Sequence, residues 1–185
     1  MNVFIFHGTN GSPAANWFPW LRKELETLGI EVFLPALPTP EGQNETNWLK
    51  TFEPYQKLVN EQTIFVGHSM GAVLAMRLLE NRNKPILAAV LAAPFHEELH
   101  LGEDFDRLLI SFIDHHFDWK KIKNNCTKFV VFEGDDDPYV PLKQPKFIAE
   151  KLAAKLVVIP RGGHLSEETG YRQFPAILEE IKRLL

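Results

Sequence analysis

Short apolar runs recur along the whole chain, and each is apolar nearly throughout instead of alternating with polar residues. The runs are four to eight residues long, are rich in Val, Ile and Phe, and cover residues 3–6, 31–35, 63–67, 87–93, 128–132 and 155–159. Strands that are apolar on both faces are typical of a parallel sheet with helices packed on each side. We therefore expect parallel strands at the centre of the fold.

Segments with helical spacing separate these runs. Apolar residues three and four apart predict helices over residues 14–28, 45–59, 70–81, 104–116, 143–153 and 171–185. A regular alternation of strands and helices favours a three-layer α/β/α fold with right-handed crossovers. The chain has 185 residues and no linker or repeat, so a single domain over residues 1–185 is expected.

The amino-acid composition argues against several classes of binding partner. The net charge is −4, from 20 basic and 24 acidic residues, and no basic run is present, so a nucleic-acid partner is not expected. No apolar stretch of about 18 residues occurs, so no membrane span is expected. Cys126 is the only cysteine, and the first residues do not resemble a secretory signal. These features predict a cytoplasmic protein.

The stretch Gly67-His68-Ser69-Met70-Gly71 lies between the third apolar run and the next predicted helix. A serine flanked by glycines two residues away on each side forms a nucleophile elbow when it occupies such a turn. Small residues make room for the sharp bend, and the N–H of Met70 is placed to stabilise an oxyanion. The simpler alternative is a turn in which Ser69 only caps the helix.

Candidate partners for Ser69 follow later in the chain. An acidic turn containing Asp135, Asp136 and Asp137 comes after the fifth run, and His164 follows two glycines after the sixth. A nucleophilic serine needs a base, and the base needs a carboxylate that orients it. The order serine, acid, histidine is that of the α/β-hydrolases. Spacing alone does not choose among the aspartates, and a solvated turn and a loop histidine are the alternative interpretations.

These motifs resemble those of the α/β-hydrolase superfamily, whose acid loop often has the pattern G-x-x-D-x-x-V-P. Residues 134–141 match that pattern, which implies Asp137 as the acid, with Asp135 and Asp136 in reserve. Residues 7–9 resemble the family's H-G-x element, which implies the Thr9 N–H as the second oxyanion donor and Asn10 as the alternate. His7 is then expected to be a structural residue beneath this loop.

The small size and the strand at residue 3 resemble the compact serine hydrolases related to retinoblastoma-binding protein nine. This resemblance implies a compact α/β-hydrolase fold with six parallel strands in the order 2-1-3-4-5-6. It also implies hydrolysis of a small ester, thioester or amide through an acyl-enzyme, with no metal or organic cofactor. The L-x-C-x-E element associated with retinoblastoma binding is absent. Nothing in the sequence therefore supports that protein partner, and a small acyl substrate is expected.

Two alternatives compete with this interpretation. Residues 96–100 satisfy H-E-x-x-H, so His96 and His100 could bind zinc in a peptidase. That site needs both histidines on one helical face, and Pro94 and Gly102 leave little room for such a helix. The other alternative is a binding module that keeps the hydrolase scaffold without its activity.

The sequence says least about which residues line the pocket. Residues 96–126 must supply a core helix, so at most a minimal lid and a shallow, open site are expected there. Five aromatic residues are candidates for the wall of an acyl pocket, although core packing is the simpler interpretation of each. They are Trp17, Phe18, Trp20, Trp48 and Trp119.

Overall fold

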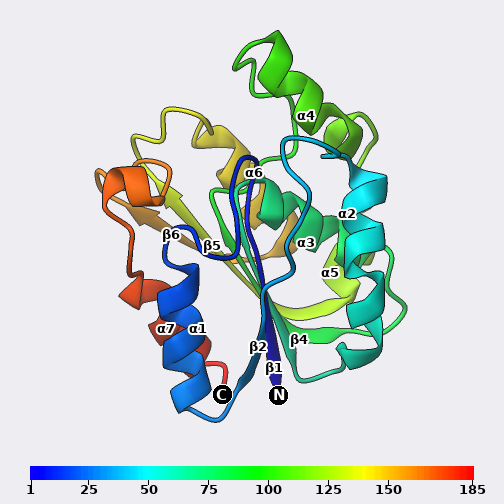
Figure 1. Cartoon of the computed structure of the whole chain (residues 1–185), viewed down its shortest axis with the longest axis vertical. Coiled ribbons are helices and arrows are strands. Elements are labelled where there is room, and N and C mark those ends of the chain that lie inside the picture. The colour runs from blue at the N-terminus through cyan, green and yellow to red at the C-terminus, as the bar shows by residue number, and fades with distance from the viewer.

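Six parallel strands form one sheet in the computed structural model, which describes residues 1–185 (Figure 1). Every neighbouring pair is parallel, and the order β2-β1-β3-β4-β5-β6 confirms the predicted topology. The strands are β1 (Asn2–Phe6), β2 (Glu31–Phe33), β3 (Thr63–His68), β4 (Ile86–Ala92), β5 (Cys126–Gly134) and β6 (Lys155–Ile159).

Helices cover both faces of this sheet, as the α/β/α prediction requires. Helices α1 and α7 pack on one face, and α2, α3, α5 and α6 pack on the other (Figure 1). No helix is long and apolar enough to cross a membrane. The α-helices are α1 (Phe18–Thr27), α2 (Glu45–Phe52), α3 (Met70–Glu80), α4 (Glu103–Ile113), α5 (Trp119–Asn124), α6 (Lys143–Leu152) and α7 (Pro175–Lys182); the 3₁₀ helices are η1 (Glu53–Leu58) and η2 (Glu167–Thr169).

The continuous apolar runs are explained by these two cores. In β1, Val3 and Ile5 point into the core beneath α1 and α7, whereas Phe4 and Phe6 point into the larger core on the other face. None of the four is more than 2% exposed. Because successive strand residues alternate between faces, burial on both sides removes the need for polar positions.

Some predicted helices have different bounds in the structure. The expected helix over 45–59 is wrong beyond Phe52, where Pro54 cannot donate an α-helical hydrogen bond and the chain continues as η1. The last helix begins at Pro175 and not at residue 171. Helix α5 was not predicted; the Asp118 side chain caps it by accepting from the Lys121 N–H at 2.9 Å.

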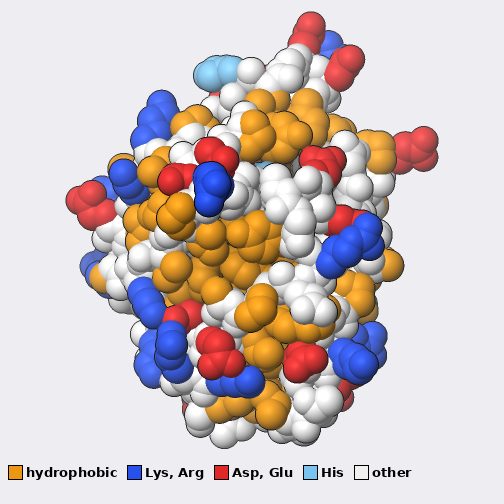
Figure 2. Space-filling view, turned by 90° about the vertical axis from the view of Figure 1, so that its left-hand side faces the viewer, with side chains coloured by type: hydrophobic (Ala, Val, Ile, Leu, Met, Phe, Trp, Pro, Cys, Tyr) orange, Lys and Arg blue, Asp and Glu red, His pale blue; other side chains and the backbone are white.

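β6 is an edge strand, paired with β5 on one side only. Val158 is 38% exposed, and its neighbours Val157 and Ile159 are half-buried. Figure 2 views the molecule from this side and shows apolar side chains gathered in the middle of the face, with charged side chains around them. Lys155 is the first residue of the strand and Arg161 lies two residues after its end, and charges at a strand edge oppose pairing with another sheet.

Helix α4 rises above the carboxyl ends of the strands, where the candidate residues lie (Figure 1). The fully buried Arg77 of α3 anchors the end of α4, because its guanidinium donates to the carbonyls of Phe112 at 2.7 Å and His115 at 2.7 Å. It also pairs with Glu80 at 2.7 Å. A buried charge with this many partners is satisfied, so it fixes α4 against the body of the protein.

Candidate active site

Ser69 occupies a strained turn between β3 and α3. Its backbone has φ 55° and ψ −124°, a conformation that side-chain-bearing residues rarely adopt. A Cβ on Gly71 would lie 2.2 Å from the Phe6 carbonyl oxygen, and one on Gly67 would lie 2.5 Å from the Ala72 Cα. Both glycines are therefore required by close backbone approach, and together they present Ser69 at the end of the sheet.

Asp137 and His164 are brought together from two separate loops. His164 Nδ1 lies 2.7 Å from Asp137 Oδ2, while Asp137 Oδ1 accepts from the N–H groups of Tyr139 at 2.8 Å and Val140 at 3.0 Å. Burial raises the pKa of Asp137, but the His164 contact and the two N–H groups outweigh it and leave that pKa lowered. The carboxylate therefore holds Nδ1–H and leaves Nε2 facing outward.

The other two aspartates shape the loop that carries His164. Asp135 Oδ1 accepts from the Arg161 N–H at 2.7 Å, and Asp136 Oδ1 accepts from the Gly163 N–H at 2.7 Å. Neither makes a hydrogen bond with the imidazole. Of the three aspartates that spacing could not separate, the structure brings Asp137 to His164 and uses the other two to fix the backbone before it.

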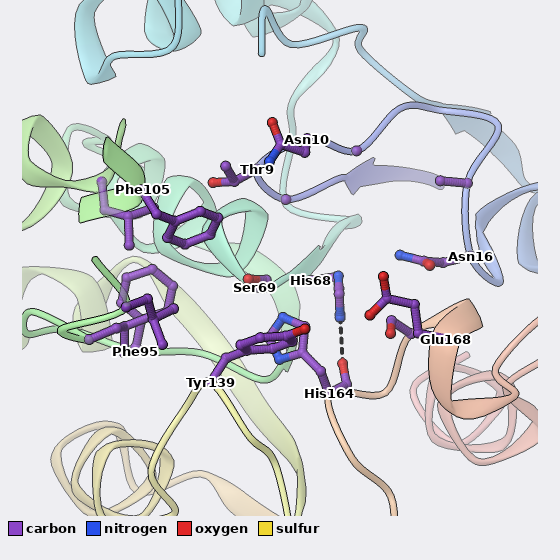
Figure 3. Close-up of a pocket in the computed structure, with 17 residues that line it drawn as sticks. Thr9, Asn10, Asn16, His68, Ser69, Phe95, Phe105, Tyr139, His164 and Glu168 are labelled. Atoms are coloured by element: carbon purple, nitrogen blue, oxygen red, sulfur yellow. Dashed lines mark hydrogen bonds between the residues drawn. The ribbon is translucent and has the colours of Figure 1, made fainter. Parts of the chain in front are cut away.

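Ser69 and His164 line the same cavity, which has a volume of about 430 Å³ (Figure 3). No hydrogen bond joins the Ser69 hydroxyl to the imidazole, and His164 Nε2 has no other hydrogen-bond partner. Hydrogen bonds between catalytic groups are often long without substrate and tighten when it binds. The arrangement leaves Nε2 free to accept the proton of Ser69.

Two backbone N–H groups remain available near Ser69. Met70 is the first residue of α3, and no side chain caps this helix end. The Thr9 N–H makes no hydrogen bond, whereas the Asn10 N–H donates to Thr39 Oγ1 at 2.8 Å. The loop passes close to the serine, because a Cβ on Gly8 would lie 3.4 Å from Ser69 Oγ. Thr9, rather than Asn10, thus keeps its donor free.

Two further histidines support the site without facing Ser69 as bases. His68 is buried, its Nε2–H donates to the His164 carbonyl at 2.8 Å, and burial with the nearby His164 lowers its pKa to about 3. His7 is also buried; its Nδ1 bonds the Gly8 carbonyl at 2.9 Å and its Nε2 accepts from the Leu37 N–H at 3.0 Å. The structural role of His7 was predicted from the sequence, but that of His68 was not. The only signal for His68 in the sequence is its position next to Ser69 at the end of β3.

The cavity has an apolar end and a polar end. Residues from the loop after β4 and from α4 line the apolar end, namely Phe95, Leu99, Leu101, Phe105 and Leu109. The polar end, on the other side of Ser69, is lined by Asn16 and Glu168 (Figure 3). None of the five aromatic residues proposed for an acyl pocket lines it, because they pack elsewhere; for instance, Trp17 Nε1 donates to the Leu165 carbonyl at 3.0 Å in the core.

The H-E-x-x-H segment does not form the helix that a zinc peptidase requires. Residues 96–100 are irregular, and His100 has a φ of 56°. The His96 ring stacks on Phe147 with centroids 4.4 Å apart and meets Trp119 edge-on, while the His100 side chain is 80% exposed. The two rings therefore do not share a helical face, and this motif gives no support to the zinc alternative.

Glu133 is an unexpected buried acid behind the site. It lies in β5, is fully buried, and neither carboxylate oxygen has a hydrogen-bond partner. Burial and the neighbouring charge of Asp137 raise the pKa of Glu133 to about 10. The side chain is therefore a neutral carboxylic acid at pH 7, and Asp137 is the carboxylate that bonds His164.

Comparison with known proteins identifies the family of this chain. The family described as Serine hydrolase matches residues 3–183. The putative hydrolase YdeN of Bacillus subtilis is 30% identical over 97% of this chain and 93% of its own length, and the crystal structure of that gene product superposes with a TM-score of 0.92 over 99% of this chain and 97% of that one. The serine hydrolase RBBP9 of Rattus norvegicus is 30% identical over 98% of this chain and 94% of its own.

More distant structures share the fold alone. Est1E of Butyrivibrio proteoclasticus superposes with a TM-score of 0.73 at 16% identity, over 99% of this chain and 87% of that one. The family match and the similarity to RBBP9 confirm the resemblance to compact serine hydrolases, which was drawn from the chain length and the strand at residue 3.

The burial of Glu133 predicts a pH-dependent difference in stability between the wild type and Glu133→Gln. A pKa of about 10 in the folded protein exceeds the value of about 4.3 for an unfolded glutamate, so folding is favoured by the protonated acid. The contribution of Glu133 to the free energy of unfolding of the wild type is fully present below about pH 4. It is lost progressively as the pH rises toward 10. Chemical denaturation from pH 5 to 9 should show Glu133→Gln gaining stability relative to wild type.

The control for this comparison is Glu61→Gln, which changes an exposed glutamate with no hydrogen bond. It should show no growing difference from wild type across the same range. A stability difference for Glu133→Gln that stays constant with pH would show that Glu133 has the same charge in the folded and unfolded chain, contrary to its burial.

Proposed function

The chain belongs to the serine hydrolase family, and we propose that it cleaves a small ester, thioester or amide through an acyl-enzyme on Ser69. The observation that carries the proposal is that a strained serine and a carboxylate-bound histidine line one cavity. A scaffold used only for binding has no need of backbone strain at Ser69 together with a buried Asp137 directed at an imidazole.

The proposed reaction proceeds in two displacements. Ser69 Oγ attacks the carbonyl carbon while His164 Nε2 takes its proton, and Asp137 stabilises the imidazolium. The N–H groups of Met70 and Thr9 receive the oxyanion. The tetrahedral intermediate then expels the leaving group, which takes the proton from His164. Water attacks the acyl-enzyme with the same assistance, which releases the acid and restores Ser69.

The two ends of the cavity support an orientation for the substrate. We place the acyl group at the apolar end, against Phe95, Phe105 and Leu109, since burying apolar surface there is favourable. The leaving group then lies toward Asn16 and Glu168, on the other side of Ser69 in Figure 3. A carboxylesterase-like preference for short to medium apolar acyl groups is the specificity that these walls favour.

Labelling with a fluorophosphonate probe tests the proposal, because the probe phosphonylates an activated serine. Wild type should be labelled and should hydrolyse p-nitrophenyl butyrate, whereas Ser69→Ala should do neither. Absence of labelling and of turnover on any short-chain ester would favour the binding-module alternative. Turnover that survives Ser69→Ala and is lost with a chelator would favour the zinc alternative instead.

The choice of acid gives a second test. Asp137→Asn should lower kcat by about 10⁴-fold, because an amide at this position stabilises the wrong tautomer of His164. Asp135→Asn is the matched control, since Asp135 contacts only the backbone of the loop. Steady-state kinetics on p-nitrophenyl esters measures both. A loss for Asp137→Asn no greater than that for Asp135→Asn would reassign the acid.

A further inference from the structure

The cavity has one acidic side chain among its lining residues, and it lies at the polar end. Glu168 is the only Asp, Glu, Lys or Arg among the lining residues. Its carboxylate points into the cavity toward His68 (Figure 3). His68 cannot neutralise it, because burial and the nearby His164 keep that imidazole uncharged, with a pKa of about 3.

Glu168 is also free of any protein partner. It takes part in no hydrogen bond and no ion pair, whereas the adjacent Glu167 pairs with Arg172. Asn16 stands beside it at the cavity wall; Asn16 Oδ1 accepts from the Glu167 N–H at 2.9 Å, so its amide nitrogen is left toward the cavity (Figure 3). The polar end therefore presents an unpaired carboxylate and an amide to the leaving group of the substrate.

We propose that this end is a subsite for a positively charged leaving group, an amino or ammonium alcohol, held by Glu168. The inference rests on the proposed function, since it needs an acyl group at the apolar end. A cleft lined by one sign of charge concentrates the opposite charge. The same carboxylate repels leaving groups that carry a negative charge.

Two butyryl esters of the same shape test this subsite. One is the choline ester, and the other is the 3,3-dimethylbutyl ester, in which carbon replaces the ammonium nitrogen. Wild type should favour the choline ester in kcat/KM, and Glu168→Gln should reduce the choline-to-neutral ratio by roughly threefold to fivefold, as expected for an exposed charge pair. The effect should shrink as salt is added, because the screening length falls.

Glu167→Gln is the matched control, because it removes a neighbouring charge that is already paired with Arg172. Its choline-to-neutral ratio should equal that of wild type. If Glu168→Gln hydrolyses both esters with the wild-type ratio, the charged subsite is wrong while the proposed function stands. If neither ester is turned over in a Ser69-dependent way, the proposed function fails and the subsite fails with it.

A separate observation concerns Gln43, which joins three segments around the oxyanion donors. Its Nε2 donates to Thr9 Oγ1 at 2.8 Å and to the Leu108 carbonyl of α4 at 2.9 Å. Its Oε1 accepts from the Thr39 hydroxyl at 2.6 Å, and Thr39 in turn accepts from the Asn10 N–H at 2.8 Å. Gln43 is only 7% exposed, and every polar atom of its side chain is bonded.

These contacts assign Gln43 as a positioning residue for the oxyanion hole. It holds the side chain of Thr9 and, through Thr39, the amide of Asn10, so the free Thr9 N–H is kept directed at the site of reaction. Its bond to Leu108 ties the same loop to α4, whose Phe105 and Leu109 line the apolar end. A donor misplaced by a fraction of an ångström loses much of its effect on an oxyanion.

Isosteric variants test this role. Thr9→Val, which lacks the acceptor, and Gln43→Glu, which lacks both donors, should each lower kcat by roughly tenfold with KM within about twofold, since only the transition state carries the oxyanion. Thr9→Ser keeps the accepting hydroxyl and should lose less kcat than Thr9→Val. Rates are normalised to active sites counted with a fluorophosphonate, so unfolded protein does not contribute.

The double variant adds a further constraint. Thr9→Val combined with Gln43→Glu should lose little more than the worse single variant, because both break one shared hydrogen bond. A wild-type kcat for Thr9→Val, or an equal loss for Thr9→Ser, would overturn the assignment. A lower melting temperature with unchanged kcat per active site would show that Gln43 serves stability alone.

Discussion

Close backbone contact between the start of α3 and the end of β1 is the constraint on which the site depends. Gly71 lies so near the Phe6 carbonyl that any side chain would collide with it. This contact places the Ser69 turn, the Met70 N–H and the loop that carries Thr9 in one small volume. The strain at Ser69 is maintained because β1 and β3 are central, fully buried strands that cannot shift to relieve it.

Burial also decides which groups around the site carry charge. Glu133, His68 and Asp137 lie within the same region, yet burial keeps the first two neutral, whereas the contacts of Asp137 keep it ionised. One carboxylate is thus matched to one imidazole, and the supporting residues add no competing charge. In the open cavity, by contrast, the Glu168 side chain lies where a ligand can reach it.

The sequence predicted what depends on local pattern and chain order. Continuous apolar runs specified the sheet, and the glycines around Ser69 specified the turn, because each reflects a physical requirement visible within a few residues. The apolar wall of the cavity was not predicted. In the sequence, Phe105 and Leu109 look like ordinary core residues of a helix, and they line the cavity because the buried Arg77 fixes the position of α4. His68, Glu133 and Gln43 were missed for the same reason: their roles arise from contacts between distant segments.

A crystal structure of the enzyme phosphonylated by a short-chain phosphonate tests the central claim most directly. The account predicts phosphorus bonded to Ser69 Oγ, its oxygen about 3 Å from both the Met70 and Thr9 nitrogens, and His164 Nε2 within hydrogen-bond distance of Ser69 Oγ. The alkyl chain should lie against Phe105. An adduct on another residue, or an oxygen directed away from both nitrogens, would contradict it.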